Sequence, residues 1–364
     1  MINLHHNIQY CDQVFSFEQI LEQYEINKSH ILDLIKNNPQ NLVYLWKHYL
    51  CADYYCQNLQ LCSSCETLSH IQNEKQINIP FKSKNNYMIL IKNNIQKPYI
   101  KLVDNKMKGD IFTIKLLITW ILEKTLNENI LKLHTGFICQ HDGYLLYDIP
   151  VINEELCPFD RLIEYKYTKE IVYGLLTQVI VLFHQLTSFE FSMGRPYQNS
   201  LLFDKTPYYK EYIYNNLKYK IQCDYTIKLS DLTNSSLKYH HILFFPENCI
   251  HEMIYNHFNA PFKQNDNTFT INLNQFDANK IILPQSIDLY LMILSMMSHD
   301  NFFNTVMENQ DCYDLWKSLW VDQESIIEER LIEMNENTQL HTLLKDIQLY
   351  IDPYKNAFNY MNMV

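Results

Sequence analysis

Glycine is scarce in this sequence, which has five glycines among 364 residues. Average usage would supply about 25 in a chain of this length. None of the five precedes Gly109. Only glycine lets backbone N–H groups close tightly over a phosphate group, so a glycine-rich phosphate loop is excluded from the N-terminal part of the chain.

Runs of positive charge and long apolar runs are missing as well. The chain has 30 basic and 41 acidic residues, a net charge of -11 at pH 7, and its basic residues form no cluster. This balance argues against nucleic acid as a partner. No apolar run reaches the ~18 residues that a membrane-spanning helix needs, and the N-terminus lacks the basic-then-apolar order of a secretory signal. We therefore expect a soluble intracellular protein without a membrane span.

The composition is that of a globular protein. Hydrophobic residues make up 47% of the chain and charged residues 20%, which is enough core for two domains or for one bilobal domain with an extension. Ten cysteines are too few for a disulfide framework in a chain of this length, and an intracellular setting keeps thiols reduced.

Four cysteines lie close together in the N-terminal region, at Cys51, Cys56, Cys62 and Cys65. The Cys62-Ser-Ser-Cys65 spacing allows two thiolates to bind one Zn²⁺, but Cys51 and Cys56 lack the short spacing of a second ligand pair. We expect reduced, partly buried thiols and no metal at these positions. A structural zinc site is the alternative.

Hydrophobic periodicity predicts the order of the secondary-structure elements. The first half is predicted to contain helices within residues 1–75, including Phe17–Tyr24 and Ser29–Lys36, short strands between Ile77 and Asn94, a strand at Pro98–Val103, a helix at Asp110–Glu123, strands at Leu131–Cys139 and Tyr144–Ile149, and a linker at Asp148–Pro150. The second half is predicted to contain a buried helix at Thr168–Leu186, strands at Leu201–Phe203 and Ile227–Asp231, and helices at Ser286–Met297, Tyr313–Val321, Glu324–Asn335 and Leu340–Ile351.

The stretch Phe189–Ser236 carries two short motifs separated by a polar insert. It begins FEFSMGRPYQNSLLF, where an apolar strand follows Asn199, and it ends YTIKLSDLTNSS, where an apolar strand ends at Asp231. In this order it resembles the protein kinase-like proteins of large cytoplasmic DNA viruses, which read HNDLHxxNI, then an insert, then KIxDF. The resemblance implies an α+β, bilobal kinase-like fold, with an N-terminal helical extension at 1–75, a small β-rich lobe at 76–150 and a larger helical lobe at 151–364.

The same resemblance implies a vestigial nucleotide and magnesium site. Protein kinases bind magnesium with the Asn of the catalytic loop and the Asp of D-F-G, and a strand lysine pairs with the α/β-phosphates. Asn199, Asp231 and Lys101 take these three positions here. The helix glutamate that pairs with the lysine corresponds to Asp110, with Glu123 as a later substitute.

Two further positions follow from the alignment. Asp288, early in a predicted helix, takes the position of an aspartate that accepts backbone N–H groups from the catalytic loop, which begins here at Phe191. Gly194 stands at the position of the catalytic Asp, so no catalytic residue is expected. A substitute base could come from Glu190 or His184, but we expect both to serve packing or solvation.

The sequence therefore predicts a catalytically inactive kinase-like viral protein, a pseudokinase that acts as a scaffold or protein-interaction module. The expected partners are viral or host proteins, in the host cytoplasm or in the virion. We expect no cofactor, or at most weak binding of Mg-ATP. The alternatives are an active serine/threonine-type kinase with an atypical catalytic loop, and an unrelated α+β structural protein in which the motifs are accidental.

Overall fold

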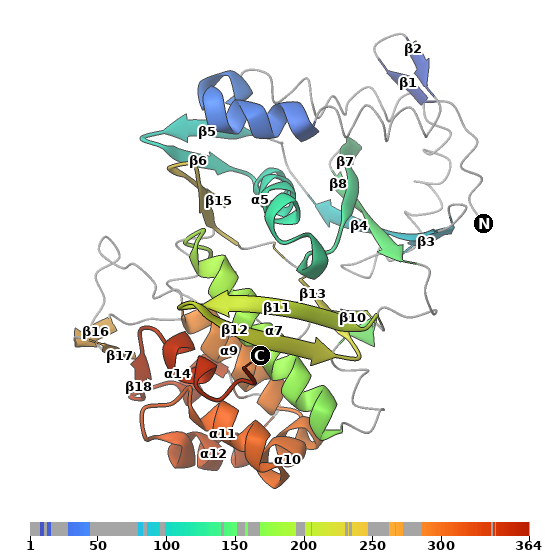
Figure 1. Cartoon of the computed structure of the whole chain (residues 1–364). Coiled ribbons are helices and arrows are strands. Elements are labelled where there is room, and N and C mark those ends of the chain that lie inside the picture. The colour runs from blue at the N-terminus through green and yellow to red at the C-terminus, as the bar shows by residue number, and fades with distance from the viewer. Residues whose placement is uncertain are drawn as a thin grey trace. The chain divides into compact units, whose positions relative to one another are not determined.

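The structure is a computed structural model of the chain. It describes residues 8–10, 13–15, 28–43, 79–82, 86–94, 99–139, 142–150, 157–158, 168–193, 201–204, 206–229, 232, 235–246, 262–265, 267–271, 286–335, 338 and 340–363. These residues form small sheets and several helices, so the predicted α+β class is confirmed (Figure 1). The chain divides into two compact units, one of Met1–Glu154 with Lys238–Glu247 and one of Glu155–Leu237 with Asn248–Val364.

The first unit contains two four-stranded sheets and a two-stranded ribbon. One sheet is antiparallel and has the order β3 (Ile79–Lys82), β4 (Asn86–Asn94), β8 (Asp142–Pro150), β7 (Leu133–Cys139). The other has the order β14 (Leu237–Tyr239), β15 (Ile242–Pro246), β6 (Lys106–Gly109), β5 (Ile100–Val103). The ribbon pairs β1 (Ile8–Tyr10) with β2 (Gln13–Phe15).

Strand β15 enters the first unit from far along the sequence. It pairs with β6 in parallel, with Phe244 opposite Met107, and both side chains are fully buried. This pairing explains why Lys238–Glu247 belongs to the first unit, although the predicted division at residue 150 places it with the second domain.

Helix α5 (Ile111–Thr125) packs against β6 and β15 of one sheet and β7 of the other (Figure 1). Every residue from Phe112 to Glu123 is buried. A helix whose residues are all buried is covered on every side by other parts of the protein. A short 3-10 helix, η1 (Asn127–Asn129), follows it.

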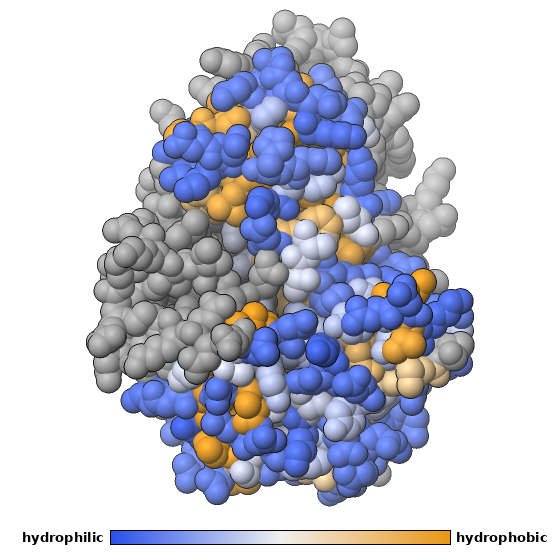
Figure 2. Space-filling model, turned by 60° about the vertical axis from the view of Figure 1, so that its left-hand side comes forward, coloured by the Kyte–Doolittle hydropathy of each residue, from blue (hydrophilic) through white to orange (hydrophobic). Residues whose placement is uncertain are grey.

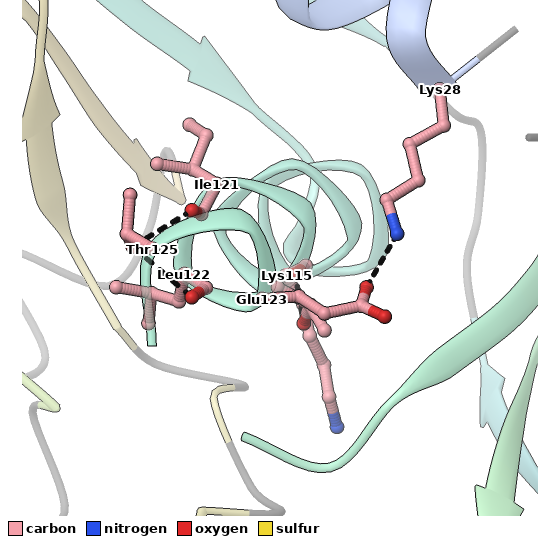
Figure 3. A network of polar contacts seen from close by, with 7 residues as sticks. Lys28, Lys115, Ile121, Leu122, Glu123 and Thr125 are labelled. Atoms are coloured by element: carbon pink, nitrogen blue, oxygen red, sulfur yellow. Dashed lines mark hydrogen bonds and ion pairs between the residues drawn. The ribbon is translucent and has the colours of Figure 1, made fainter. Parts of the chain in front are cut away.

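Residues 28–37 are helical and lie against α5. Lys28 donates to the carboxylate of Glu123 at 2.6 Å, and both side chains are nearly inaccessible to water (Figure 3). Ile31 and Ile35, both fully buried, lie one turn apart on the same helix face. The predicted helix Ser29–Lys36 is therefore confirmed, and it is an integral part of the first unit.

The second unit is built on two buried helices, α7 (Lys169–Thr187) and α9 (Ile287–Met297). All residues of α9 are buried. Among the described residues, α7 is long and apolar enough to cross a membrane by length and composition, yet 67% of its apolar window is buried inside the structure. That burial is the pattern of a core helix. The remaining helices of this unit are α10 (Asp300–Glu308), α11 (Gln310–Lys317), α12 (Glu324–Ile332), α13 (Leu340–Leu343) and α14 (Tyr354–Phe358).

Three small sheets complete the second unit. The first has the order β13 (Thr226–Leu229), β10 (Leu201–Asp204), β9 (Cys157–Pro158). The second is the hairpin of β11 (Tyr208–Tyr214) and β12 (Leu217–Cys223), and the third has the order β16 (Phe262–Asn265), β17 (Thr268–Ile271), β18 (Gln348–Tyr350).

Four predictions of secondary structure differ from the structure. Residues 1–75 were expected to be a helical extension, but they also contain the strands β1 and β2. The segment Leu340–Ile351 was expected to be one helix, but it holds α13 and then β18, because Asp346 adopts a φ of 60° and the chain then pairs with β17. The helix predicted at Tyr313–Val321 begins earlier and ends at Lys317. Asp148–Pro150 is the end of strand β8 and not a linker. The predicted helix Phe17–Tyr24 lies outside the described residues.

Candidate functional site

Most of the predicted site residues lie outside the described part of the chain. These are Gly194, Asn199 and Asp231 of the two motifs and the four cysteines Cys51, Cys56, Cys62 and Cys65. The structure describes the segments on both sides of the motif residues. These segments show where the chain enters and leaves each motif. All of these flanking segments belong to the second unit.

The segment before Gly194 is anchored by a buried hydrogen bond. The N–H of Met193 donates to Oδ2 of Asp288 at 2.7 Å, from the end of the segment after α7 to the first turn of α9. Both residues are buried. The expectation that Asp288 accepts a backbone N–H group from this loop is therefore confirmed.

Burial changes the acidity of Asp288. It raises the pKa of the carboxyl from 3.8 to about 7, while the hydrogen bond from the Met193 N–H acts in the opposite direction. A charged group without water loses its solvation, so the neutral acid is favoured in spite of the N–H donor. Near neutral pH this carboxyl therefore exchanges between its protonated and charged forms.

Backbone pairing brings the two motifs into one neighbourhood. Leu201, two residues after Asn199, lies opposite Leu229, two residues before Asp231, in the antiparallel pair of β10 and β13. Ser192 and Ser236 form an isolated antiparallel bridge through two N–H to carbonyl hydrogen bonds of 2.9 and 2.8 Å. The strand after the first motif thus pairs with the strand before the second, as the sequence alignment requires.

Gln178 ties helix α7 to β13, and the sequence analysis did not identify it. Its Nε2 donates to the carbonyl of Tyr225 at 2.8 Å, and its Oε1 accepts from the N–H of Ile227 at 3.1 Å. A buried amide needs such partners. The sequence does contain a signal for this role. Gln178 lies among the apolar residues of a long helix, where a polar side chain needs a specific partner.

Gly174, one turn earlier on α7, allows the helix and β12 to approach closely. An added Cβ would lie 2.7 Å from Cβ of Cys223 and 2.8 Å from the carbonyl oxygen of Gln222. Any side chain at this position would therefore push the helix and the strand apart. Gly174 and Gln178 together fix α7 against the chain that leads to Asp231.

His184 is part of an aromatic cluster. Its Nδ1 lies 2.7 Å from the hydroxyl of Tyr212, and its ring makes edge contacts with Tyr214, Tyr354 and Phe358. Burial lowers the pKa of the imidazole. The expectation that His184 serves packing is therefore confirmed. Glu190, the other residue considered as a base, is exposed and adopts a φ of 45°.

The residues expected around Lys101 have other partners in the first unit. Asp110 caps helix α5, where its carboxylate accepts from the N–H groups of Tyr99 and Thr113 and from the Thr113 hydroxyl. Glu123 forms the ion pair with Lys28. Lys101 lies on β5 with an exposed side chain, and its Nζ is 5.9 Å from the ring centroid of Tyr99.

Among the described residues, two surface hollows lie in the second unit. One, of about 590 Å³, lies beside the start of α7 and is bordered by Lys169, Glu170 and Tyr173. The other, of about 510 Å³, lies among α10, α11 and α12. Neither is lined by Met193 or Asp288. The described residues contain no group of three or more His, Cys, Asp or Glu side chains that could hold a metal ion.

The described residues form a mixed α+β protein in which the buried Asp288 accepts the N–H of Met193, directly before Gly194. No protein-family model matches the chain, and no curated protein matches it either.

Proposed function

We propose that this chain is a catalytically inactive kinase-like protein, or pseudokinase, of a large DNA virus. It acts as a scaffold or protein-interaction module in the cytoplasm of the host cell. The observation that carries the proposal is the buried hydrogen bond from the Met193 N–H to Asp288, directly before Gly194. This bond supports the interpretation that the loop has kept its shape but has lost its catalytic base.

The strand pairing supports the same proposal. The register of β10 against β13 places Leu201, two residues after Asn199, opposite Leu229, two residues before Asp231. Two magnesium ligands would need to approach each other in this way to share a metal-phosphate group. Gln178 and Gly174 hold that pair against α7.

Several positions lack a side chain that is able to take the role that phosphoryl transfer needs there. Gly194 offers no carboxylate to accept the proton of a substrate hydroxyl, and His184 is engaged in an aromatic cluster. Asp110 is occupied as a helix cap and Glu123 by Lys28, so the two candidate partners of Lys101 already serve structural roles. Positioning and electrostatics supply most of the rate of this reaction, so combined losses remove most of it.

Mg-ATP binding is the property that separates the proposal from its alternative. An active serine/threonine-type kinase with an atypical loop would bind Mg-ATP, and at a hundredfold excess over its Kd the nucleotide would add about 3 kcal/mol to the free energy of unfolding. We expect a much smaller effect, or none, because the glycine-rich loop is absent.

The experiment is a thermal denaturation with and without Mg-ATP, run beside the Asn199→Ala, Asp231→Ala double variant. The expected result is a similarly small shift of Tm in both proteins. A rise of several degrees in the wild type that disappears in the variant would show a functional nucleotide site and favour the active kinase.

A further inference from the structure

Helices α10, α11 and α12 enclose the hollow of about 510 Å³ on the surface of the second unit, here named the α10–α12 groove. Its lining is mixed, and apolar or aromatic side chains make up half of it. Phe303 and Met307 are one turn apart on α10 and therefore share a face, and Tyr313 lies on α11. These three side chains are half-buried, whereas Ile332 at the end of α12 is 71% exposed.

Ile332 is the most exposed large hydrophobic side chain among the described residues. On the face shown in Figure 2, hydrophobic residues form small patches within a mostly hydrophilic surface. An isoleucine that is 71% exposed beside a hollow with half-buried aromatic walls offers apolar area that a partner could remove from water.

The helices around the groove carry most of the acidic excess of the chain. Between Asp300 and Glu333 there are nine acidic and two basic residues, a net charge of -7 out of the -11 of the whole sequence. Two of the acids, Glu328 and Glu329, line the groove directly, on the same face of α12 as Ile332.

Both basic residues of this segment are engaged within the chain. Lys317 forms an ion pair with Glu324 at 2.8 Å. Arg330 donates to the backbone carbonyls of Leu343 and Lys345, at 2.7 Å each. Both positive charges are therefore paired within the chain. The carboxylates of Glu328 and Glu329 form an acidic border of the groove.

Glu328 shows the effect of this crowding. Burial and the neighbouring Glu324 raise the pKa of its carboxyl, and Lys317 opposes them. A cation placed against Glu328 would relieve the repulsion, since an opposite charge stabilises the ionised carboxylate.

We propose that the α10–α12 groove binds a basic amphipathic helix of a partner protein, with apolar side chains in the hollow and Lys or Arg side chains against Glu328 and Glu329. A helix fits because three helices form the walls, and apolar residues at i, i+3, i+4 and i+7 would enter such a groove from one face. The charge selects the sequence of the partner, since an apolar helix with acidic flanks would be repelled.

A second copy of this chain is the wrong occupant on the same grounds. The chain carries a net charge of -11, and a symmetric contact would bring two acidic grooves together. The inference rests on the proposed interaction role but not on the loss of catalysis, because the groove is lined by neither Met193 nor Asp288.

The test measures binding of a fluorescein-labelled peptide of about 15 residues, or about four helical turns, made of Leu, Ala, Lys and Arg. Its leucines follow the i, i+3, i+4, i+7 pattern and its basic residues flank them. Two control peptides are a scramble of the same composition, which loses the apolar face, and a version with Glu in place of every Lys and Arg. The peptide lacks Ser, Thr and Tyr, so it cannot accept phosphate and its binding is independent of any kinase activity.

The protein variants separate the groove from general charge attraction. Ile332→Ser removes an exposed apolar contact, and Glu328→Lys with Glu329→Lys reverses the acidic border. The matched control is Glu128→Lys with Glu211→Lys, which makes the same change of net charge at two exposed residues outside the groove. Circular dichroism and Tm confirm that each variant is folded.

At about 0.15 M ionic strength, we expect the wild type to bind the amphipathic peptide at least about tenfold more tightly than either control peptide. Ile332→Ser and the Glu328, Glu329 reversal should each weaken binding about tenfold or more, and the distant reversal should have a much smaller effect. Equal binding of the scrambled peptide, equal loss in the distant reversal, or no binding at all would overturn the proposal. So would a concentration-dependent dimer in sedimentation that Ile332→Ser abolishes, because the groove would then hold a second copy.

Discussion

The Met193 N–H and the Asp288 carboxylate are joined by a 2.7 Å hydrogen bond between residues 95 positions apart. It connects the end of the segment after α7 with the first turn of α9, in a part of the second unit without access to water. A buried N–H group is costly to leave without an acceptor, so the bond fixes Met193, the residue before Gly194, against α9.

Replacing Asp288 with leucine should destabilise the protein. The Met193 N–H would lose its acceptor in a buried site, which costs about 1–3 kcal/mol of the free energy of unfolding. Urea denaturation at pH 8 measures the change. A variant as stable as the wild type would mean that the bond contributes nothing to the second unit.

Asp288→Asn is the matched control, because its amide oxygen can still accept the N–H, and the loss should be smaller. It also tests the raised pKa of Asp288. A folded pKa of about 7 against 3.8 means that the folded protein binds this proton more tightly, so its stabilising effect is greatest in acid and declines as pH rises from 3.8 to 7. The stability of the wild type relative to Asp288→Asn should therefore fall over that range and stay level above it.

Gln178→Leu should destabilise the second unit more than Gln185→Leu on the same helix. Gln178 serves the backbones of Tyr225 and Ile227, and without it these buried groups lose their partner, at a cost of about 1–3 kcal/mol. Oε1 of Gln185 is buried and has no hydrogen-bond partner among the described residues, so its removal should be neutral or stabilising. Chemical denaturation of both variants gives the comparison. Equal losses would show that helix packing and not the amide bonds matters.

The sequence predicts the long elements of this fold well. The stripe of Ile171, Leu175, Val179, Leu182 and Leu186 identifies α7. Ile171 is half-buried and the other four side chains are buried. Helix α9 and strands β7, β10 and β13 also lie where apolar patterns place them. In α7, α9, β10 and β13 the local pattern and the buried face agree, so one sequence window contains the information.

Other parts depend on contacts that no local window contains. The pairing of β15 with β6 joins segments far apart in the chain, and Gln348–Tyr350 becomes a strand because β17 is beside it. The hairpin β11–β12 was read only as a polar insert, although Asn215 and Asn216 are favoured in a turn with positive φ. At the site, the role of Asp288 could be predicted because the kinase resemblance assigns a role to its position. The partner of Glu123 could not be predicted, because Lys28 lies in the N-terminal extension.

The Lys28–Glu123 ion pair should be strongly coupled. Removing one partner leaves the other charge buried, so Lys28→Met or Glu123→Leu should each cost about 3–5 kcal/mol. The double variant Lys28→Met, Glu123→Leu should regain much of this loss, since an apolar pair can replace a buried ion pair. A double-mutant cycle by denaturation gives the coupling. Additive losses would contradict the direct pairing of the two groups.

His184 should make the protein less stable in acid. Burial lowers its pKa below 6.5, so the unfolded chain takes up a proton near pH 6.5 that the folded protein resists, and stability falls as pH drops through this range. His184→Phe keeps a ring among Tyr214, Tyr354 and Phe358 but cannot titrate. The stability difference between the two proteins should therefore change between pH 7 and 5. A constant difference would show that His184 does not titrate differently on folding.

Phosphoryl transfer is the measurement that tests the central claim most directly. Purified protein is incubated with Mg-ATP labelled in the γ-phosphate and with protein and peptide acceptors, beside the Asn199→Ala, Asp231→Ala variant prepared in the same way. We expect the two proteins to give the same background incorporation, because Gly194 cannot act as the base. Incorporation well above background in the wild type, abolished in the variant, would show that the chain is an active kinase with an atypical loop.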